Sequence, residues 1–75
     1  MTFEEYNRIK TTMEHVIVVL NVGKEYEKAD EVDDLLFAML LDYDKMPAKT
    51  YKTKFKKYYE KAMSCDAYEM KGFTL

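Results

Sequence analysis

The sequence predicts an all-α fold, a small three-helix bundle that forms a single domain over residues 1–75. Apolar residues recur with a helical spacing of three or four in three separate segments, and Gly23 and Pro47 stand between those segments. The chain has 75 residues, of which 48% are apolar and 35% charged, as in a globular protein with one modest core. Each segment carries its own signals for where a helix begins and ends.

The first helix is predicted over residues 3–21. Thr2 and Glu5 have the spacing of a capping box, and Gly23 is a natural stop. Apolar side chains then share one face of a helical wheel: Tyr6, Ile9, Met13, Val16, Ile17 and Leu20. The run Val16–Val19 consists of β-branched residues, which favour a strand. This run leaves an alternative α+β fold open, in which Val16–Leu20 pairs with Tyr51–Lys56 as a short hairpin.

The second helix is predicted over residues 30–46. Asp30 can cap its beginning, acidic residues suit the positive end of its dipole, and Pro47 ends it. One apolar stripe contains Val32, Leu35, Leu36, Met39, Tyr43 and Met46. Phe37 and Leu41 lie on the opposite side, so this helix is apolar on two faces.

The third helix is predicted over residues 48–65, and residues 70–75 form a loose tail after it. Its stripe has spacings of 4, 3, 4 and 3 and contains Tyr51, Phe55, Tyr58, Ala62 and Cys65. The apolar–polar alternation of Tyr51–Lys56 also fits a strand, but it fails at Lys57 while the helical stripe continues.

The residue types exclude most catalytic and metal chemistry. Cys65 and His15 are the only cysteine and histidine, so neither a disulfide nor a usual zinc site can form within one chain. No motif surrounds them that would make a nucleophile and its base, and two glycines cannot supply a phosphate-binding loop. We therefore expect no enzyme, no catalytic or metal-binding residue and no cofactor. The apolar runs are too short to cross a membrane, and no signal peptide is recognisable, so we expect a cytoplasmic protein.

Charge is divided unevenly along the chain. Residues 1–44 carry eleven acidic and four basic side chains, a net charge of −7, and residues 45–75 carry eight basic and three acidic ones, a net charge of +5. The acidic side chains predict a partner-binding face that imitates the phosphates of nucleic acid, made of Glu25, Glu27, Asp30, Glu31, Asp33, Asp34, Asp42 and Asp44. A solvated helix face is the alternative interpretation.

Two further surfaces are candidates for binding. Phe37, Leu40 and Leu41 form an apolar strip that indicates a homodimer or a partner protein, unless the second helix is buried on both sides. An alternative nucleic-acid face on the third helix consists of Lys52, Lys54, Lys56, Lys57 and Lys61. Aromatic residues and lysines occupy different sides of that helix, however, which favours an ordinary core-facing helix.

In size, acidity and preference for lysine over arginine, the chain resembles the small proteins with which phages disable the replication, transcription or defence enzymes of their bacterial hosts. The segment Asp33-Asp34-Leu35-Leu36-Phe37 is also similar, at its Leu36-Phe37 end, to the peptides that dock bacterial proteins on the DNA sliding clamp. These resemblances imply an inhibitor in the cytoplasm of a bacterial host. They make the clamp, whose DNA channel is positively charged, one candidate target.

We therefore expect a small non-catalytic inhibitor or modulator that binds a nucleic-acid-handling protein and forms a homodimer. Two other functions stay open. One is a nucleic-acid-binding or repressor-type protein that acts through the third helix, and the other is a structural or assembly subunit.

Overall fold

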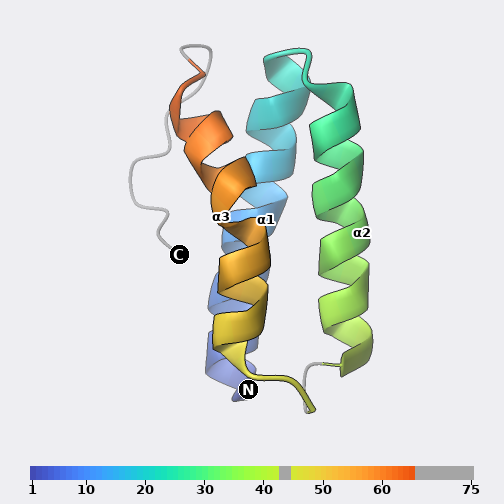
Figure 1. Ribbon diagram of the computed structural model, residues 1–75, viewed down its shortest axis with the longest axis vertical. Helices are drawn as coiled ribbons and strands as arrows, with labels where there is room; N and C mark the ends of the chain where they lie inside the picture. The colour runs from blue at the N-terminus through green and yellow to red at the C-terminus, as the bar shows by residue number, and fades with distance from the viewer. Residues whose placement is uncertain (43–44, 66–75) are drawn as a thin grey trace.

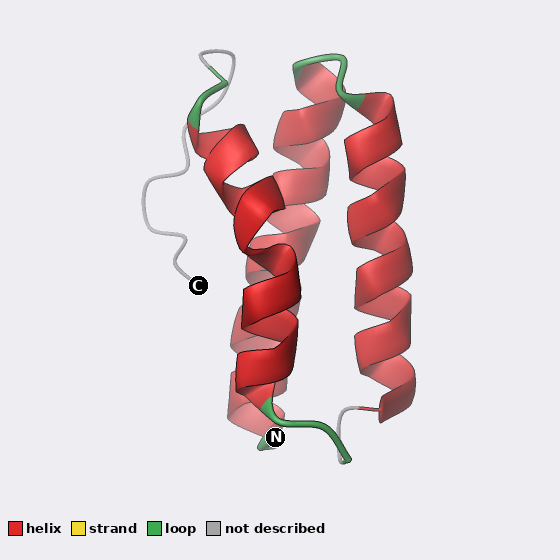
Figure 2. Cartoon of the chain, in the orientation of Figure 1, coloured by secondary structure: helices red, strands yellow, loops and turns green. Residues whose placement is uncertain are grey.

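Three helices make up the part of the chain that a computed structural model describes, residues 1–42 and 45–65. They are α1 (Phe3–Val22), α2 (Tyr26–Asp42) and α3 (Ala48–Met63). Each packs against the other two, and α1 and α3 run in one direction while α2 runs in the other (Figure 1). This arrangement confirms the predicted three-helix bundle. Within the described ranges no strand is present (Figure 2), so the α+β alternative is wrong for Val16–Leu20 and Tyr51–Lys56.

The first helix begins where its capping box predicts. The Thr2 hydroxyl accepts a hydrogen bond from the Glu5 amide at 3.1 Å, and the Glu5 carboxylate accepts one from the Thr2 amide at 2.8 Å. The β-branched run stays helical because Val16 and Val19 are fully buried in the core. Burial here outweighs the intrinsic preference of these residues for a strand.

The predicted bounds of α2 are wrong by four residues at each end, since it covers Tyr26–Asp42 and not 30–46. A tight turn at Gly23 and Lys24 ends α1 and leads directly into α2, whose first turn includes a hydrogen bond from the Ala29 amide to the Glu25 carbonyl at 3.0 Å. Buried Ala29 anchors this extra turn against the core. Asp30 therefore lies inside the helix and caps nothing.

The third helix begins after Pro47, as predicted, and ends at Met63, two residues earlier than predicted. The Ser64 hydroxyl donates to the Lys61 carbonyl at 2.7 Å and satisfies one of the last carbonyls of the helix. The tail predicted over residues 70–75 lies outside the described residues.

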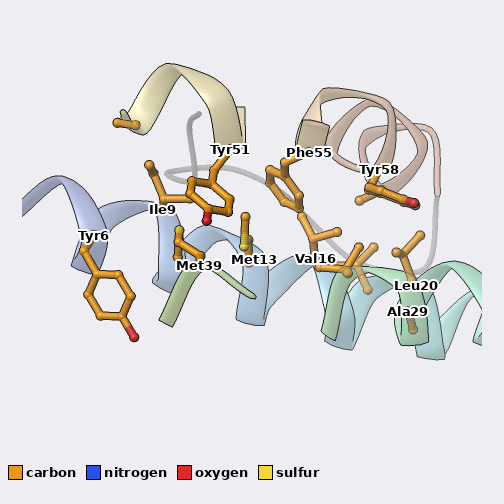
Figure 3. Packing of buried hydrophobic residues seen from close by; sticks show 14 residues of the cluster. Tyr6, Ile9, Met13, Val16, Leu20, Ala29, Met39, Tyr51, Phe55 and Tyr58 are labelled. Atoms are coloured by element: carbon orange, nitrogen blue, oxygen red, sulfur yellow. The ribbon is translucent and has the colours of Figure 1, made fainter. Parts of the chain in front are cut away.

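One core lies between the three helices. Ile9, Met13, Val16 and Leu20 of α1 face Tyr51, Phe55 and Tyr58 of α3, and Ala29 and Met39 of α2 pack against them (Figure 3). The inner side of α2 is thus buried in the core. Its outer side does not contribute to the core.

Candidate protein-binding surface

The side of α2 that points away from the core carries five residues at spacings of 3, 4, 3 and 4. These residues, which we call the outer seam, are Glu27, Asp30, Asp34, Phe37 and Leu41. At 3.6 residues per turn such spacings keep side chains in one line along a helix. All five are exposed. The seam is acidic over its first three positions and apolar over its last two.

The apolar end of the seam is exposed to solvent. Phe37 is 61% exposed and Leu41 63%, and Leu40 beside them is 51% exposed. Leu40 and Phe37 also line a groove of about 350 Å³ between α2 and α1, with Tyr6 and Lys10 on the α1 side. The predicted apolar strip is therefore brought together on the surface, and the interpretation that α2 is buried on both sides does not hold for residues 1–42 and 45–65.

Two of the predicted acidic residues are occupied by contacts inside the bundle. The Glu25 carboxylate lies 3.2 Å from the Lys28 ammonium and 3.3 Å from the Lys61 ammonium. Hydrogen bonds from Lys28 and then Lys61 hold the pKa of Glu25 below its usual value. The Glu31 carboxylate accepts a hydrogen bond from the Tyr58 hydroxyl at 2.7 Å. That bond, together with burial, raises the pKa of Tyr58 to about 12.

Four other acidic residues remain together on α2: Glu27, Asp30, Asp33 and Asp34. All are exposed, and none forms a salt bridge with another residue of the described ranges. Asp33 lies beside the seam and lines the groove toward α1. Asp42 is half-buried at the far end of α2, where its charge raises the pKa of Tyr51 after the larger effect of burial. Asp44 lies outside the described residues. Among the described residues, four of the predicted acids thus form one exposed cluster without salt bridges on the first half of α2.

The lysines of the predicted nucleic-acid face on α3 contact several different groups of the bundle. Lys61 pairs with Glu25, and Lys56 lies 4.0 Å from Glu60 of the same helix. Lys54 and Lys57 line a shallow groove opposite Glu31 and Asp34, and their ammonium groups lie over the rings of Tyr51 and Tyr58.

The aromatic side chains of that face are not available for stacking, because Tyr51, Phe55 and Tyr58 are buried. Half-buried Lys52 lies on the same helix. The structure therefore supports the interpretation of α3 as a core-facing helix with a basic exterior.

Other candidate chemistry is sparse in residues 1–42 and 45–65. No group of three or more histidine, cysteine, aspartate or glutamate side chains is placed to hold a metal ion there. No helix in these ranges is long and apolar enough to cross a bilayer. Cys65 is half-buried just beyond α3, with its thiol 3.4 Å from the Lys61 carbonyl, and His15 is half-buried on α1.

Sequence reasoning did not identify the outer seam, although the signal was present. The spacing of Asp30, Asp34, Phe37 and Leu41 joins the acidic cluster and the apolar strip, which are predicted as two surfaces, into one line. The contacts of Glu25 with Lys61 and of Glu31 with Tyr58 could not be predicted from the sequence, because they join residues 27 or more positions apart and depend on how α3 packs.

Comparisons with known proteins do not indicate a function for this chain. No protein-family model matches the chain, and searches of curated proteins and of solved structures find no match.

Proposed function

We propose that the protein is a non-catalytic inhibitor or modulator that binds a nucleic-acid-handling protein through α2, in the cytoplasm of a bacterial host. The observation that carries this proposal is the cluster of four exposed carboxylates without salt bridges in the described ranges, next to exposed Phe37 and Leu41 on the same rigid helix. The carboxylates supply charge, and the apolar residues supply area that a partner can bury.

The density of charge on α2 suits competition with DNA. Glu27 and Asp34 are seven residues apart, which corresponds to about 10 Å at 1.5 Å per residue. Five carboxylates lie within that length, and all but Glu31, which accepts a hydrogen bond from Tyr58, belong to the cluster of four. One DNA strand carries a phosphate about every 3.4 Å, so it presents about four charges over the same distance. A basic groove that binds a DNA strand can therefore meet a similar line of negative charge on this helix.

The DNA sliding clamp remains one candidate target because of its positively charged channel. Leu36 and Phe37 do not support the docking-peptide route to it. Both belong to α2, and Leu36 is half-buried against the core while Phe37 points outward. An extended peptide would have to present both side chains to the clamp.

Direct binding of nucleic acid through α3 is the weaker candidate. Tyr51, Phe55 and Tyr58 are buried and Tyr59 is partly buried against the core, and Lys61 and Lys56 already have acidic neighbours. Single-strand binders need exposed rings on which bases can stack.

The test is capture of a partner from bacterial lysate, followed by competition with DNA using the isolated partner. We expect DNA to displace the protein, and we expect the association rate to fall as salt rises. Asp30→Asn, Asp33→Asn and Asp34→Asn combined should reduce affinity by about 1–3 kcal/mol while the fold is kept. The matched control is Glu14→Gln, an exposed acid on α1, which should bind as the wild type does. Binding that ignores both salt and the triple substitution would refute the proposal.

A further inference from the structure

The outer seam has the residue spacing of a coiled-coil interface. Its spacings of 3, 4, 3 and 4 are those of alternating a and d positions in two heptads. The seam belongs to a helix of 17 residues, long enough for about 25 Å of contact. Side chains in this pattern interlock with a second helix that crosses at a small angle.

We propose that the outer seam docks a helix of the partner protein, with lysine or arginine opposite Asp30 and Asp34 and apolar residues opposite Phe37 and Leu41. This inference rests on the proposed function and specifies the partner: an amphipathic helix that is basic at one end of its contact face and apolar at the other. Charge complementarity selects that chemistry. A partner without cations would leave carboxylates in the interface unpaired, which is costly.

The same charges argue against a second copy of this chain on the seam. A parallel pair of α2 helices would set Asp30 against Asp30 and Asp34 against Asp34. A fully overlapping antiparallel pair would set Glu27 and Asp30 against Leu41 and Phe37 of the other copy. Either arrangement brings carboxylates together or buries them against apolar side chains. A basic partner helix removes both penalties.

The flank of the seam extends the apolar area on one side. Leu40 is 51% exposed and shares the groove toward α1 with Phe37, where Tyr6 forms the opposite wall. Lys10 and Asp33 line the same groove. Large side chains at the apolar end of the partner helix would therefore find a shaped hollow beside Phe37, while its basic end meets the carboxylates.

The experiment uses a synthetic helical peptide of about 20 residues, long enough to be helical in water when rich in alanine. Its lysines occupy two successive a/d positions and its leucines occupy the next two. A first control peptide of the same composition places leucines and lysines on opposite faces, and a second replaces lysine with glutamate. Fluorescence anisotropy with the full-length protein should show binding by the first peptide about tenfold or more tighter than by either control.

Substitutions in the protein must then locate the binding on the seam. Asp30→Asn with Asp34→Asn should weaken binding about tenfold, and Phe37→Gln with Leu41→Gln should do the same. Glu14→Gln with Val18→Gln is the matched control, because these are an exposed acid and a 47% exposed apolar residue on α1. All the substituted side chains are exposed, so circular dichroism should show the same helical content in every variant.

Three outcomes would overturn the inference. They are equal binding of all peptides, equal binding by the seam variants, and sedimentation of the wild type as a dimer that Phe37→Gln with Leu41→Gln disperses. The last result would mean that a second copy covers the seam. If the peptide test fails while DNA competition by the captured partner still depends on Asp30 and Asp34, helix docking is wrong and the proposed function stands.

Discussion

At the scale of single residues, the turn between α1 and α2 depends on Lys24 and not on glycine. Lys24 has a φ of 62°, in the left-handed region, and its amide donates to the Asn21 carbonyl at 3.0 Å. The next amide, of Glu25, donates to the Leu20 carbonyl at 2.7 Å, which completes a Schellman motif. Gly23 has an ordinary φ of −78°. Its lack of a side chain matters for another reason, since a Cβ there would lie 3.1 Å from the Cys65 sulfur.

Lys24→Gly should stabilise the protein. A left-handed conformation costs a non-glycine residue roughly 1–2 kcal/mol, and the greater freedom of glycine in the unfolded chain offsets part of the gain. We expect a net increase of about 0.5–1 kcal/mol in the free energy of unfolding, measured by urea denaturation. Lys24→Ala keeps the strain and should show no such gain. A destabilised glycine variant would mean that this turn does not impose the strain we infer.

Tyr58 and Glu31 give the stability of the fold a dependence on alkaline pH. The hydrogen bond to Glu31, and burial after it, raise the pKa of Tyr58 from 10.0 to about 12. A group whose pKa is higher in the folded state stabilises the fold in its protonated form. The contribution of Tyr58 is therefore complete below pH 10 and is lost as pH rises from about 10 to about 12.

Tyr58→Phe should remove that contribution and lower the free energy of unfolding by about 0.5–1.5 kcal/mol near neutral pH. The gap between wild type and variant should narrow above pH 10, because ionisation of Tyr58 then destabilises only the wild type. Urea denaturation of both proteins from pH 7 to pH 11 measures the gap. Other tyrosines and lysines titrate in both proteins, so the difference isolates Tyr58. If the difference in free energy of unfolding stays constant from pH 7 to pH 11, the hydrogen bond from Tyr58 to Glu31 does not stabilise the fold in the way we infer.

At the scale of whole helices, local signals predicted α1 well and α2 poorly. The beginning of α1 follows from the capping box of Thr2 and Glu5, which involves only neighbouring residues. The beginning of α2 at Tyr26 follows from a left-handed lysine and from burial of Ala29 against other helices. Neither feature has a clear local signature, and the prediction that Asp30 caps the helix is therefore wrong. The run Val16–Val19 shows the same limit, because only tertiary packing decides between helix and strand there.

The exposed acids of α2 should weaken the helix that carries them. Asp30 has like-charged neighbours three or four positions away at Glu27, Asp33 and Asp34, and each such pair costs about 0.2–0.5 kcal/mol. We expect Asp30→Asn to raise the free energy of unfolding by up to about 1 kcal/mol at low salt, with the gain shrinking as salt screens the charges. Glu14→Gln should have the opposite effect, since Lys10 lies four positions before Glu14. A surface that lowers the stability of the fold is typical of a binding site. An increase in the free energy of unfolding of Asp30→Asn that does not depend on salt would contradict this account.

At the scale of the whole molecule, the fold brings an acidic helix next to a basic one. The sequence anticipated the residue types of the candidate site, with an acidic cluster and a second apolar face on α2. It did not tell which acids the bundle would use, because Glu25 and Glu31 meet Lys61 and Tyr58 only after α3 packs. The acids left over are exposed on α2 and form no salt bridge with another residue of the described ranges, although Asp34 lines the groove toward α3. Packing therefore separates the carboxylates that hold the bundle from those available to a partner.

The whole bundle depends on one core, and its two kinds of phenylalanine should behave differently. Phe55 of α3 is fully buried between α1 and α2, whereas Phe37 is 61% exposed. Replacing a buried phenylalanine with alanine costs about 3–5 kcal/mol. A chain of this length has a free energy of unfolding of roughly 4–11 kcal/mol, at 0.05–0.15 kcal/mol per residue. Phe55→Ala should therefore unfold at a far lower urea concentration than the wild type or be largely unfolded without urea. Phe37→Ala should change the free energy of unfolding by no more than about 0.5 kcal/mol in the monomer, because the Phe37 side chain is not part of the core. Thermal and urea denaturation followed by circular dichroism compare the two, and a large loss in Phe37→Ala at low protein concentration would make Phe37 part of the core and remove it from the seam.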